Sequence, residues 1–316
     1  MSTRSSPGYS GNSATPTAQP IGLVAVIAAD WRIAAVSNNV ADFLALAPGE
    51  MLGRQVAAVF HPDALHALRN RMALIGSSDG AERLFHLPLV EGGTAFDLLV
   101  QVVDGSALID VLPAADPEGL DVAALVERTA RRCAPLVGVQ SLAEEAARCV
   151  RAMMGFDQIA IWRCDGELIA SCKRARAAIS PNGAPPPVCD RTQAVGDVEA
   201  VRCAMLFDDS RRTVNLGRSL LASQSGELER HVKSAGARAG LVVPLMVGDR
   251  QWGMISACHG YPRMAGLARL SGLELFARVL ALEIGEPSLR AAYIGLLKDR
   301  YDVVAQVGTY LIVVRR

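Results

Sequence analysis

The chain has 316 residues, which predicts about two domains at roughly 100–200 residues per domain. Hydrophobic residues make up 51% of the chain and charged residues 20%, so it can bury sizeable cores, and a wholly disordered protein is excluded. The 32 Lys and Arg residues balance the 32 Asp and Glu residues. Because the net charge is zero, the chain lacks the positive field that attracts nucleic acid or anionic lipid, and neither partner is expected.

The seven cysteines favour a reduced protein. The first of them is Cys133, no two are spaced as a CxxC pair, and their number is odd. This pattern suits neither a disulfide framework nor a four-cysteine zinc site. We therefore expect a cytoplasmic protein with mostly buried thiols and no metal site.

Nothing in the sequence predicts a membrane span. The longest apolar runs, residues 21–29 and 303–314, are shorter than the roughly 20 residues that a spanning helix needs. Residues 1–19 are rich in Ser, Gly, Thr and Pro and lack an apolar stretch, which is typical of a flexible tail and not of a signal peptide.

Residues 20–114 alternate in a way that predicts an antiparallel sheet with helices on one side. A hairpin is expected first, then a short helix that begins at Asn38 or Asn39, a second helix that begins at Pro62, and a three-stranded meander. The five strands are expected at residues 23–28, 32–37, 83–90, 95–103 and 107–112. Asp104-Gly105 suits the positive φ values of a tight hairpin turn.

A linker rich in Pro and Asp, residues 113–119, leads to a second domain at residues 120–285. The pattern again predicts an antiparallel sheet flanked by helices, so the whole chain is of the α+β class. Helices are expected at residues 121–133, 141–154, 197–207, 227–235 and 266–284, and strands at residues 158–163, 167–173, 239–247 and 251–258. The remaining extension, residues 286–316, ends in a strongly β-prone run that we expect to be paired, either within the fold or with a partner.

Several short motifs carry a resemblance. Ala18-Gln19-Pro20-Ile21-Gly22 is similar to a Gln-Pro-His-Gly motif, and Gly155-Phe156-Asp157-Gln158 leads into Ile161-Trp162-Arg163. Later come Gly236-Ala237-Arg238-Ala239, Trp252-Gly253-Met254-Ile255 and Cys258-His259. In this order and spacing they resemble the photosensory region of bacterial phytochromes, a PAS domain followed by a GAF domain. The resemblance covers about residues 18–285 and includes no PHY or kinase domain.

The resemblance implies a pocket for a linear tetrapyrrole in the GAF domain, but its attachment positions are empty. One family type attaches the bilin to a cysteine ahead of the Gln-Pro motif, where this chain has Ser5 and Ser6. The other uses a Cys-His pair, which falls here on Glu227 and Leu228. No covalently attached cofactor is therefore expected.

Other family positions have changed as well. A propionate-binding arginine falls on Ala222, and the second pocket histidine falls on Cys258. The candidate pocket residues that remain are Asp197, Val198, Leu228, Cys258 and His259. Asp197 also has a simpler interpretation as the N-cap of a helix. The stretch between Asp197 and Leu228 is shorter than in the family, which argues against the knot in which the family wraps its N-terminal segment.

Nothing in the sequence supports enzymatic activity. His61, His66, His86 and His231 have no suitably spaced ligand partner. Cys258 and His259 are adjacent on a strand, so they point to opposite faces and do not form a nucleophilic pair. There is no P-loop and no strand-linked GxGxxG motif.

The resemblance and the emptied positions together favour a sensory or regulatory module that signals through protein–protein contacts. Residues 266–284 are apolar on more than one face, and in GAF proteins such a helix implies a homodimer or heterodimer interface. One alternative is a photoreceptor that binds a bilin such as biliverdin non-covalently through Asp197, Cys258 and His259. A second alternative is a small-metabolite or redox sensor with Cys258 as a reactive thiol.

Overall fold

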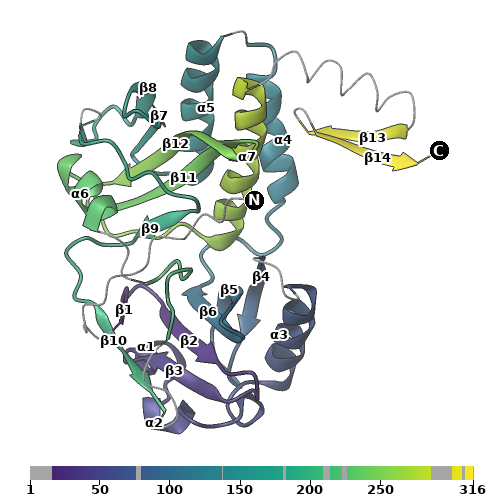
Figure 1. Ribbon diagram of the computed structural model, residues 1–316, viewed down its shortest axis with the longest axis vertical. Coiled ribbons are helices and arrows are strands. Elements are labelled where there is room, and N and C mark those ends of the chain that lie inside the picture. Colours follow the sequence, from purple (N-terminus) through teal and green to yellow (C-terminus); the bar gives the residue numbers. More distant parts are fainter. Residues whose placement is uncertain are drawn as a thin grey trace, which may run out of the picture.

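The computed structural model describes residues 16–75, 80–136, 138–180, 183–208, 214–222 and 226–284, and the backbone of residues 285, 301–307 and 310–315. The expected flexible tail up to residue 15, with Ser5 and Ser6, and residues 286–300 of the extension lie outside the described residues. Figure 1 shows two domains, one above the other, and each contains a sheet and helices. None of the described helices is both long enough and apolar enough to span a bilayer.

The first domain confirms the predicted hairpin and meander. Its antiparallel strands lie in the order β3-β2-β6-β5-β4. Their bounds are β2 Leu23–Ile27, β3 Ile33–Ser37, β4 Ala81–Pro88, β5 Ala95–Val103 and β6 Ser106–Pro113. The helices are α1 Val40–Leu44, α2 Pro48–Met51 and α3 Pro62–Ile75, with a 3-10 turn η1 at Val56–Ala58. Asp104 and Gly105 both have positive φ, 49° and 73°, as their tight turn requires.

Two further strands extend this sheet, and one corrects the sequence prediction. β10, Cys203–Phe207, pairs with β3, and β1, Thr17–Ala18, pairs with β10. The helix predicted at residues 197–207 is therefore wrong. Cys203 and Met205 are buried while Ala204 and Leu206 are less so, which is the period of a strand. A run of five apolar residues suits a helix or a strand equally well. Here it forms a strand because it pairs with the open edge of β3.

The N-terminal segment lies between two limbs of the loop that contains β10. On one side Thr17 and Ala18 pair with Ala204 and Cys203. On the other side Ala18 forms an isolated bridge with Ala222, and the amide of Gln19 donates to the carbonyl of Leu221 at 2.7 Å. The described ends of the loop thus contact the N-terminal segment from both sides.

The Gln-Pro motif has a structural role at this crossing. The buried amide of Gln19 donates to the carbonyl of Ala194 at 2.8 Å and accepts from the amide of Gly196 at 2.7 Å. A Cβ on Gly22 would lie 2.5 Å from the carbonyl oxygen of Val111. Gly22 therefore allows the segment to pass close to the first sheet.

The second domain follows the predicted order of helices and strands, apart from residues 197–207 and strand β9, which the sequence did not predict. Its sheet order is β8-β7-β12-β11-β9, all antiparallel. The strands are β7 Gln158–Arg163, β8 Leu168–Lys173, β9 Gln193–Val195, β11 Ala239–Val247 and β12 Arg250–His259. The helices are α4 Val122–Cys133, α5 Val139–Met154, α6 Gly226–Ser234 and α7 Leu267–Gly285. α4, α5 and α7 cover one face of the sheet and α6 lies on the other (Figure 1).

Ion pairs and hydrogen bonds join the first domain and the linker to α7 of the second domain. Arg83 of β4 lies 2.6 Å from Glu274 of α7, and Thr192 donates to the same carboxylate at 2.7 Å. In the linker, buried Asp116 accepts from the side chain and backbone amide of Arg269 at 2.8 and 2.9 Å. The first domain is therefore held directly against the longest helix of the second.

The β-prone end of the chain is paired within the chain. β13, Tyr301–Val307, and β14, Tyr310–Arg315, form an antiparallel hairpin. This is one of the two pairings that the sequence left open.

Candidate functional site

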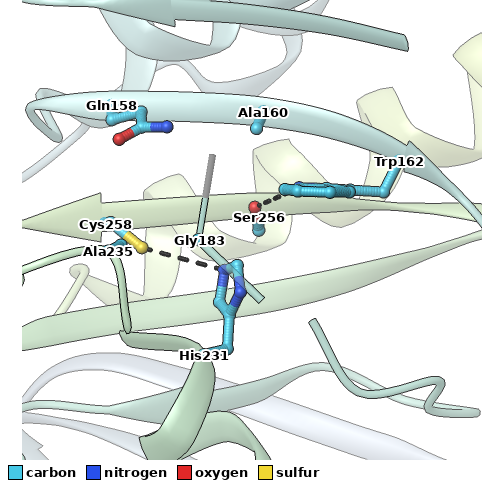
Figure 2. Close-up of a pocket in the computed structure, with 8 residues that line it drawn as sticks. All are labelled: Gln158, Ala160, Trp162, Gly183, His231, Ala235, Ser256 and Cys258. Carbon is cyan, nitrogen blue, oxygen red and sulfur yellow. Dashed lines mark hydrogen bonds between the residues drawn. The ribbon is translucent and has the colours of Figure 1, made fainter. Parts of the chain in front are cut away.

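A small pocket lies between the sheet of the second domain and α6. Because side chains alternate along a strand, β7 and β12 each direct every second residue toward it. The lining residues are Gln158, Ala160, Trp162, Gly183, His231, Ala235, Ser256 and Cys258. Figure 2 shows them converging from β7, β12, α6 and the loop at residue 183.

The protein's own side chains fill most of this space. The volume open to the centre of a water molecule is about 10 Å³, which is room for about one water. Trp162 is only 4% exposed, and it packs in one apolar cluster with Leu228, Val232 and Met254. Pockets for drug-sized ligands have volumes of roughly 300–1,000 Å³, so this one is far smaller.

Hydrogen bonds fix the two largest polar rings of the pocket. The indole Nε1 of Trp162 donates to Oγ of Ser256 at 3.0 Å. His231 Nδ1 lies 2.6 Å from the carbonyl oxygen of Ala184, and since a carbonyl can only accept, Nδ1 carries the proton. The two rings meet edge to face, with centroids 6.2 Å apart.

The thiol of Cys258 faces His231 at the floor of the pocket, but the pair is neutral. Its Sγ lies 3.9 Å from Nε2 of His231 (Figure 2). Burial raises the pKa of Cys258 to about 12 and lowers the pKa of His231. Both effects disfavour the thiolate–imidazolium form, so this pair does not supply a nucleophile.

Asp197 is engaged elsewhere. Its carboxylate accepts from Arg238 Nη2 at 2.6 Å and from Arg238 Nε at 3.1 Å. It also accepts from the amide of Glu199 at 3.0 Å in a turn. No helix begins here, so the interpretation of Asp197 as a helix N-cap is wrong. The carboxylate does not line the pocket.

His259 lies on the face of the sheet opposite to Cys258. Its Nδ1 is 2.8 Å from Oδ2 of Asp157, and its ring meets the ring of Phe156 edge to face at 5.8 Å. Burial lowers the pKa of His259 although the charge of Asp157 opposes that shift. His259 therefore packs against Asp157 and Phe156 outside the pocket.

The structure brings together only part of the predicted set. Cys258 lines the pocket, Val198 and Leu228 belong to the apolar cluster beside it, and Asp197 and His259 do not reach it. Sequence reasoning did not select Trp162, Ser256 or Gln158 as pocket residues. The alternation of β7 and β12 could have found them, because it places them on the same face as Cys258.

The chain matches two known domain families. The family described as PAS fold matches residues 14–114, and the family described as GAF domain matches residues 138–284. The chain is a PAS domain followed by a GAF domain. The resemblance seen in the sequence is confirmed at this level. No curated protein matches the chain.

Solved structures share this PAS–GAF arrangement. The wild-type chromophore-binding domain of Stigmatella aurantiaca phytochrome P1 is 20% identical with a TM-score of 0.71, over 84% of this chain and 94% of that one. The chromophore-binding domain of bacteriophytochrome RpBphP3 from R. palustris is 23% identical with a TM-score of 0.68, over 90% and 96% of the two chains. The longer photosensory core module of S. aurantiaca phytochrome is 19% identical with a TM-score of 0.72, over 89% of this chain and 61% of that one. The protein thus has the PAS–GAF fold of bacteriophytochromes.

With its side chains placed as in this structure, the pocket of the GAF domain is too small for a tetrapyrrole. Its free space is that of about one water, and Leu228, at the position where the resemblance implies the first pocket histidine, is completely buried in the apolar cluster. Burial raises the pKa of Cys258, the thiol that lines the pocket, to about 12, and this disfavours the thiolate that thioether formation needs.

Proposed function

We propose that this PAS–GAF protein is a non-enzymatic sensory or regulatory module that works without a covalently attached bilin. The observation that carries the proposal is the filled pocket. Trp162 and His231 occupy the space between β7, β12 and α6, with hydrogen bonds to Ser256 and Ala184 that hold them there.

In this proposal, α7 transmits the signal to a protein partner. Leu275 and Leu282 on this helix are 38% and 42% exposed and lie seven residues apart, hence on one face. Glu274, next to Leu275, is held by Arg83 of the PAS sheet. A rearrangement in either domain would therefore move the surface that meets the partner. A second copy of this chain is the proposed partner, and a heterodimer is the alternative.

The experiment is expression in the presence of biliverdin, followed by absorbance spectra of the native and the denatured protein. We expect no red-absorbing species, with Cys258→Ser behaving as the wild type does. Colour that survives denaturation would overturn the proposal, and its loss in Cys258→Ser would identify the attachment site.

The photoreceptor with a non-covalent bilin remains the second candidate. Its support is the fold shared with structures described as chromophore-binding domains. The three residues proposed for it, Asp197, Cys258 and His259, point to three different environments. A reversible red/far-red difference spectrum that disappears on denaturation would favour this candidate over the first.

The candidate with Cys258 as a redox thiol receives no such support. The side chain is buried, and burial raises its pKa to about 12. Rapid alkylation of Cys258 in the native protein would revive it.

A further inference from the structure

We propose that His86 and Asp97 share one proton, and that this proton makes the joint between the PAS sheet and the interdomain linker sensitive to pH. While the proton is present, His86 holds the linker. When the proton is lost as pH rises, the linker is released. The two residues lie outside the GAF pocket, so this device operates whether or not the pocket holds a bilin.

A β-bulge directs the side chain of His86. In the register of β4 with β5, two residues, Phe85 and His86, stand opposite the single residue Asp97. The backbone of His86 has a φ of 53°, in the left-handed region that residues other than glycine seldom adopt. Bulges re-aim side chains, and such strain persists only where the surrounding contacts hold it. The contacts of His86 are therefore the place to look for its role.

His86 contacts both a buried carboxylate and the linker. Its backbone amide donates to Oδ1 of Asp97 at 3.0 Å, and its ring Nδ1 lies 3.9 Å from the same oxygen, which is an ion-pair distance. The ring Nε2 lies 3.0 Å from the carbonyl oxygen of Asp116 in the linker. Since a carbonyl can only accept, Nε2 carries a hydrogen and donates it to the linker.

This arrangement requires one further proton. In a neutral ring with its hydrogen on Nε2, Nδ1 is an acceptor, and an ionised carboxylate is an acceptor as well. Asp97 is 1% exposed, and its Oδ2 has no hydrogen-bond partner among the described residues. Without a proton between them, two acceptors would face each other beside a buried charge, which is costly. A proton on Nδ1 or on the carboxyl group of Asp97 removes this cost.

The surroundings of Asp97 favour retention of the proton. Burial raises the pKa of Asp97, and the charge of Asp116 acts in the same direction. The hydrogen bond from the amide of His86 and the charge of its ring oppose this shift. A carboxyl group in such a place keeps its proton to higher pH than it would in the unfolded chain.

The other charged groups on the elements around the pair are engaged with partners of their own. These groups form the pairs Arg269–Asp116, Arg83–Glu274 and Arg71–Glu82, while Asp110 of β6 accepts from Ser219. Glu118 of the linker is exposed to solvent. His86 is therefore the cationic partner that the described residues offer to Asp97.

Asp116 connects His86 to α7. Its carbonyl accepts from His86, while its carboxylate accepts from the backbone amide of Arg269 at 2.9 Å and from Nε of Arg269 at 2.8 Å. A Cβ on Gly266 would lie 2.2 Å from Oδ2 of Asp116, so this carboxylate packs directly against the start of α7. After loss of the shared proton, Nδ1 and the carboxylate of Asp97 repel each other. We expect the ring to turn away, which breaks its bond to Asp116 and loosens the start of α7.

Hydrogen exchange of the full chain measures this release. The comparison is between the protection factors of the amides in residues 114–120 and 266–272 at about pH 5 and about pH 8, the range in which histidines ordinarily change charge. The factors are corrected for the intrinsic effect of pH on exchange. We expect the protection of both segments to fall by about tenfold or more as pH rises. Equal protection at the two pH values would overturn the proposal.

Asp97→Asn separates the shared proton from a structural role of this residue. An asparagine amide can donate to Nδ1 without an added proton, and its oxygen can still accept from the amide of His86. We therefore expect high protection of both segments at both pH values. A fall as large as that of the wild type would contradict the proposal, and it would assign the pH dependence to other groups such as Asp110, which this variant retains.

His86→Asn removes the ring but keeps a residue type that tolerates the left-handed backbone. We expect low protection of both segments at both pH values, because the bond to the carbonyl of Asp116 is lost. His66→Asn, which removes an exposed ring in α3, should behave as the wild type does. Circular dichroism shows whether each variant is folded. A measurement without any substitution accompanies them, since the NMR signals of the His86 ring should shift at the same midpoint pH as the protection. Constant ring signals would overturn the proposal.

Discussion

The carboxylate of Asp110, in β6 of the PAS sheet, accepts a hydrogen bond from the hydroxyl of Ser219 in the GAF loop. It also accepts from the backbone amides of Leu220 at 2.8 Å and Leu221 at 3.3 Å. The same stretch pairs with the N-terminal segment, since the carbonyl of Leu221 accepts from the amide of Gln19. One buried carboxylate of the first domain therefore binds the loop of the second domain that packs on the N-terminal segment.

This carboxylate makes the stability of the protein depend on pH. Burial raises the pKa of Asp110 from 3.8 to about 6, against the opposing effect of its hydrogen bonds. Between these values the folded protein binds a proton that the unfolded chain has lost, so the free energy of unfolding falls as pH rises through this window. At 1.36 kcal/mol per pKa unit the loss from this group is about 3 kcal/mol. Urea denaturation from about pH 4 to about pH 7 measures it.

Other carboxylates also titrate in this range, so the informative quantity is a difference between proteins. In Asp110→Asn the contribution disappears, and the fall in unfolding free energy over the window should be smaller by that amount. Asp190→Asn removes an exposed carboxylate and should leave the wild-type profile unchanged. Parallel profiles for wild type and Asp110→Asn would show that Asp110 does not titrate in this way.

Gln19→Met tests the anchor of the N-terminal segment. Methionine has a similar length but cannot bond to the carbonyl of Ala194 or the amide of Gly196, and both bonds are buried. At about 1–3 kcal/mol for each of these two unpaired buried groups, we expect a loss of about 2–6 kcal/mol in unfolding free energy. Gln55→Met, which removes one exposed bond to the carbonyl of Asp30, should change it by less than about 0.5 kcal/mol. Equal losses of unfolding free energy in the two variants would show that the buried bonds of Gln19 stabilise the protein no more than an exposed bond does.

Most elements could be predicted because their signals are local. The Asp104-Gly105 turn and the alternation on either side of it define the β5–β6 hairpin, and the periodic apolar residues of α5 end at Gly155, which adopts the left-handed conformation. The failure at residues 197–207 has the opposite cause. β10 is a strand because β3, about 170 positions earlier by the register of Phe207 with Ala35, has an open edge.

The site was harder to predict for a related reason. The resemblance selected positions by family spacing, and only tertiary structure shows which of these side chains still face one another. His231 of α6 and Trp162 of β7 meet across the pocket although 69 positions separate them (231 − 162). Asp197 and His259 were selected by position, but Asp197 pairs with Arg238, His259 lies against Asp157, and neither lines the pocket.

Trp162→Ala tests whether the indole is what fills the GAF pocket. Removal of a buried aromatic side chain should lower the unfolding free energy by about 3–5 kcal/mol. Trp162→Phe retains most of the volume and loses the hydrogen bond to Ser256, so we expect a smaller cost of about 1–2 kcal/mol. Indole should raise the melting temperature of Trp162→Ala and leave that of the wild type unchanged. An equal response of both proteins to indole would place its binding outside this pocket.

The exposed leucines of α7 provide the test of self-association. Leu275 and Leu282 lie on one face of the helix, and burial of such side chains stabilises an interface by about 1.5–3 kcal/mol each. Leu275→Glu and Leu282→Glu should each weaken the dimer by roughly 10- to 100-fold in Kd, because a carboxylate would then have to lose its water. Sedimentation equilibrium measures the change, and unaltered circular dichroism should accompany it because both side chains are solvent-exposed.

Leu74→Glu is the matched control for this experiment. Leu74 is 67% exposed on α3 of the PAS domain, so the variant carries the same chemical change on a different helix. It should associate as the wild type does. If Leu74→Glu dissociates as readily as the α7 variants, the effect is one of net charge and not of an interface. A wild-type protein that sediments as a monomer at every concentration would contradict the homodimer. The alternative is then a heterodimer, and we expect the same two substitutions to abolish binding of that partner.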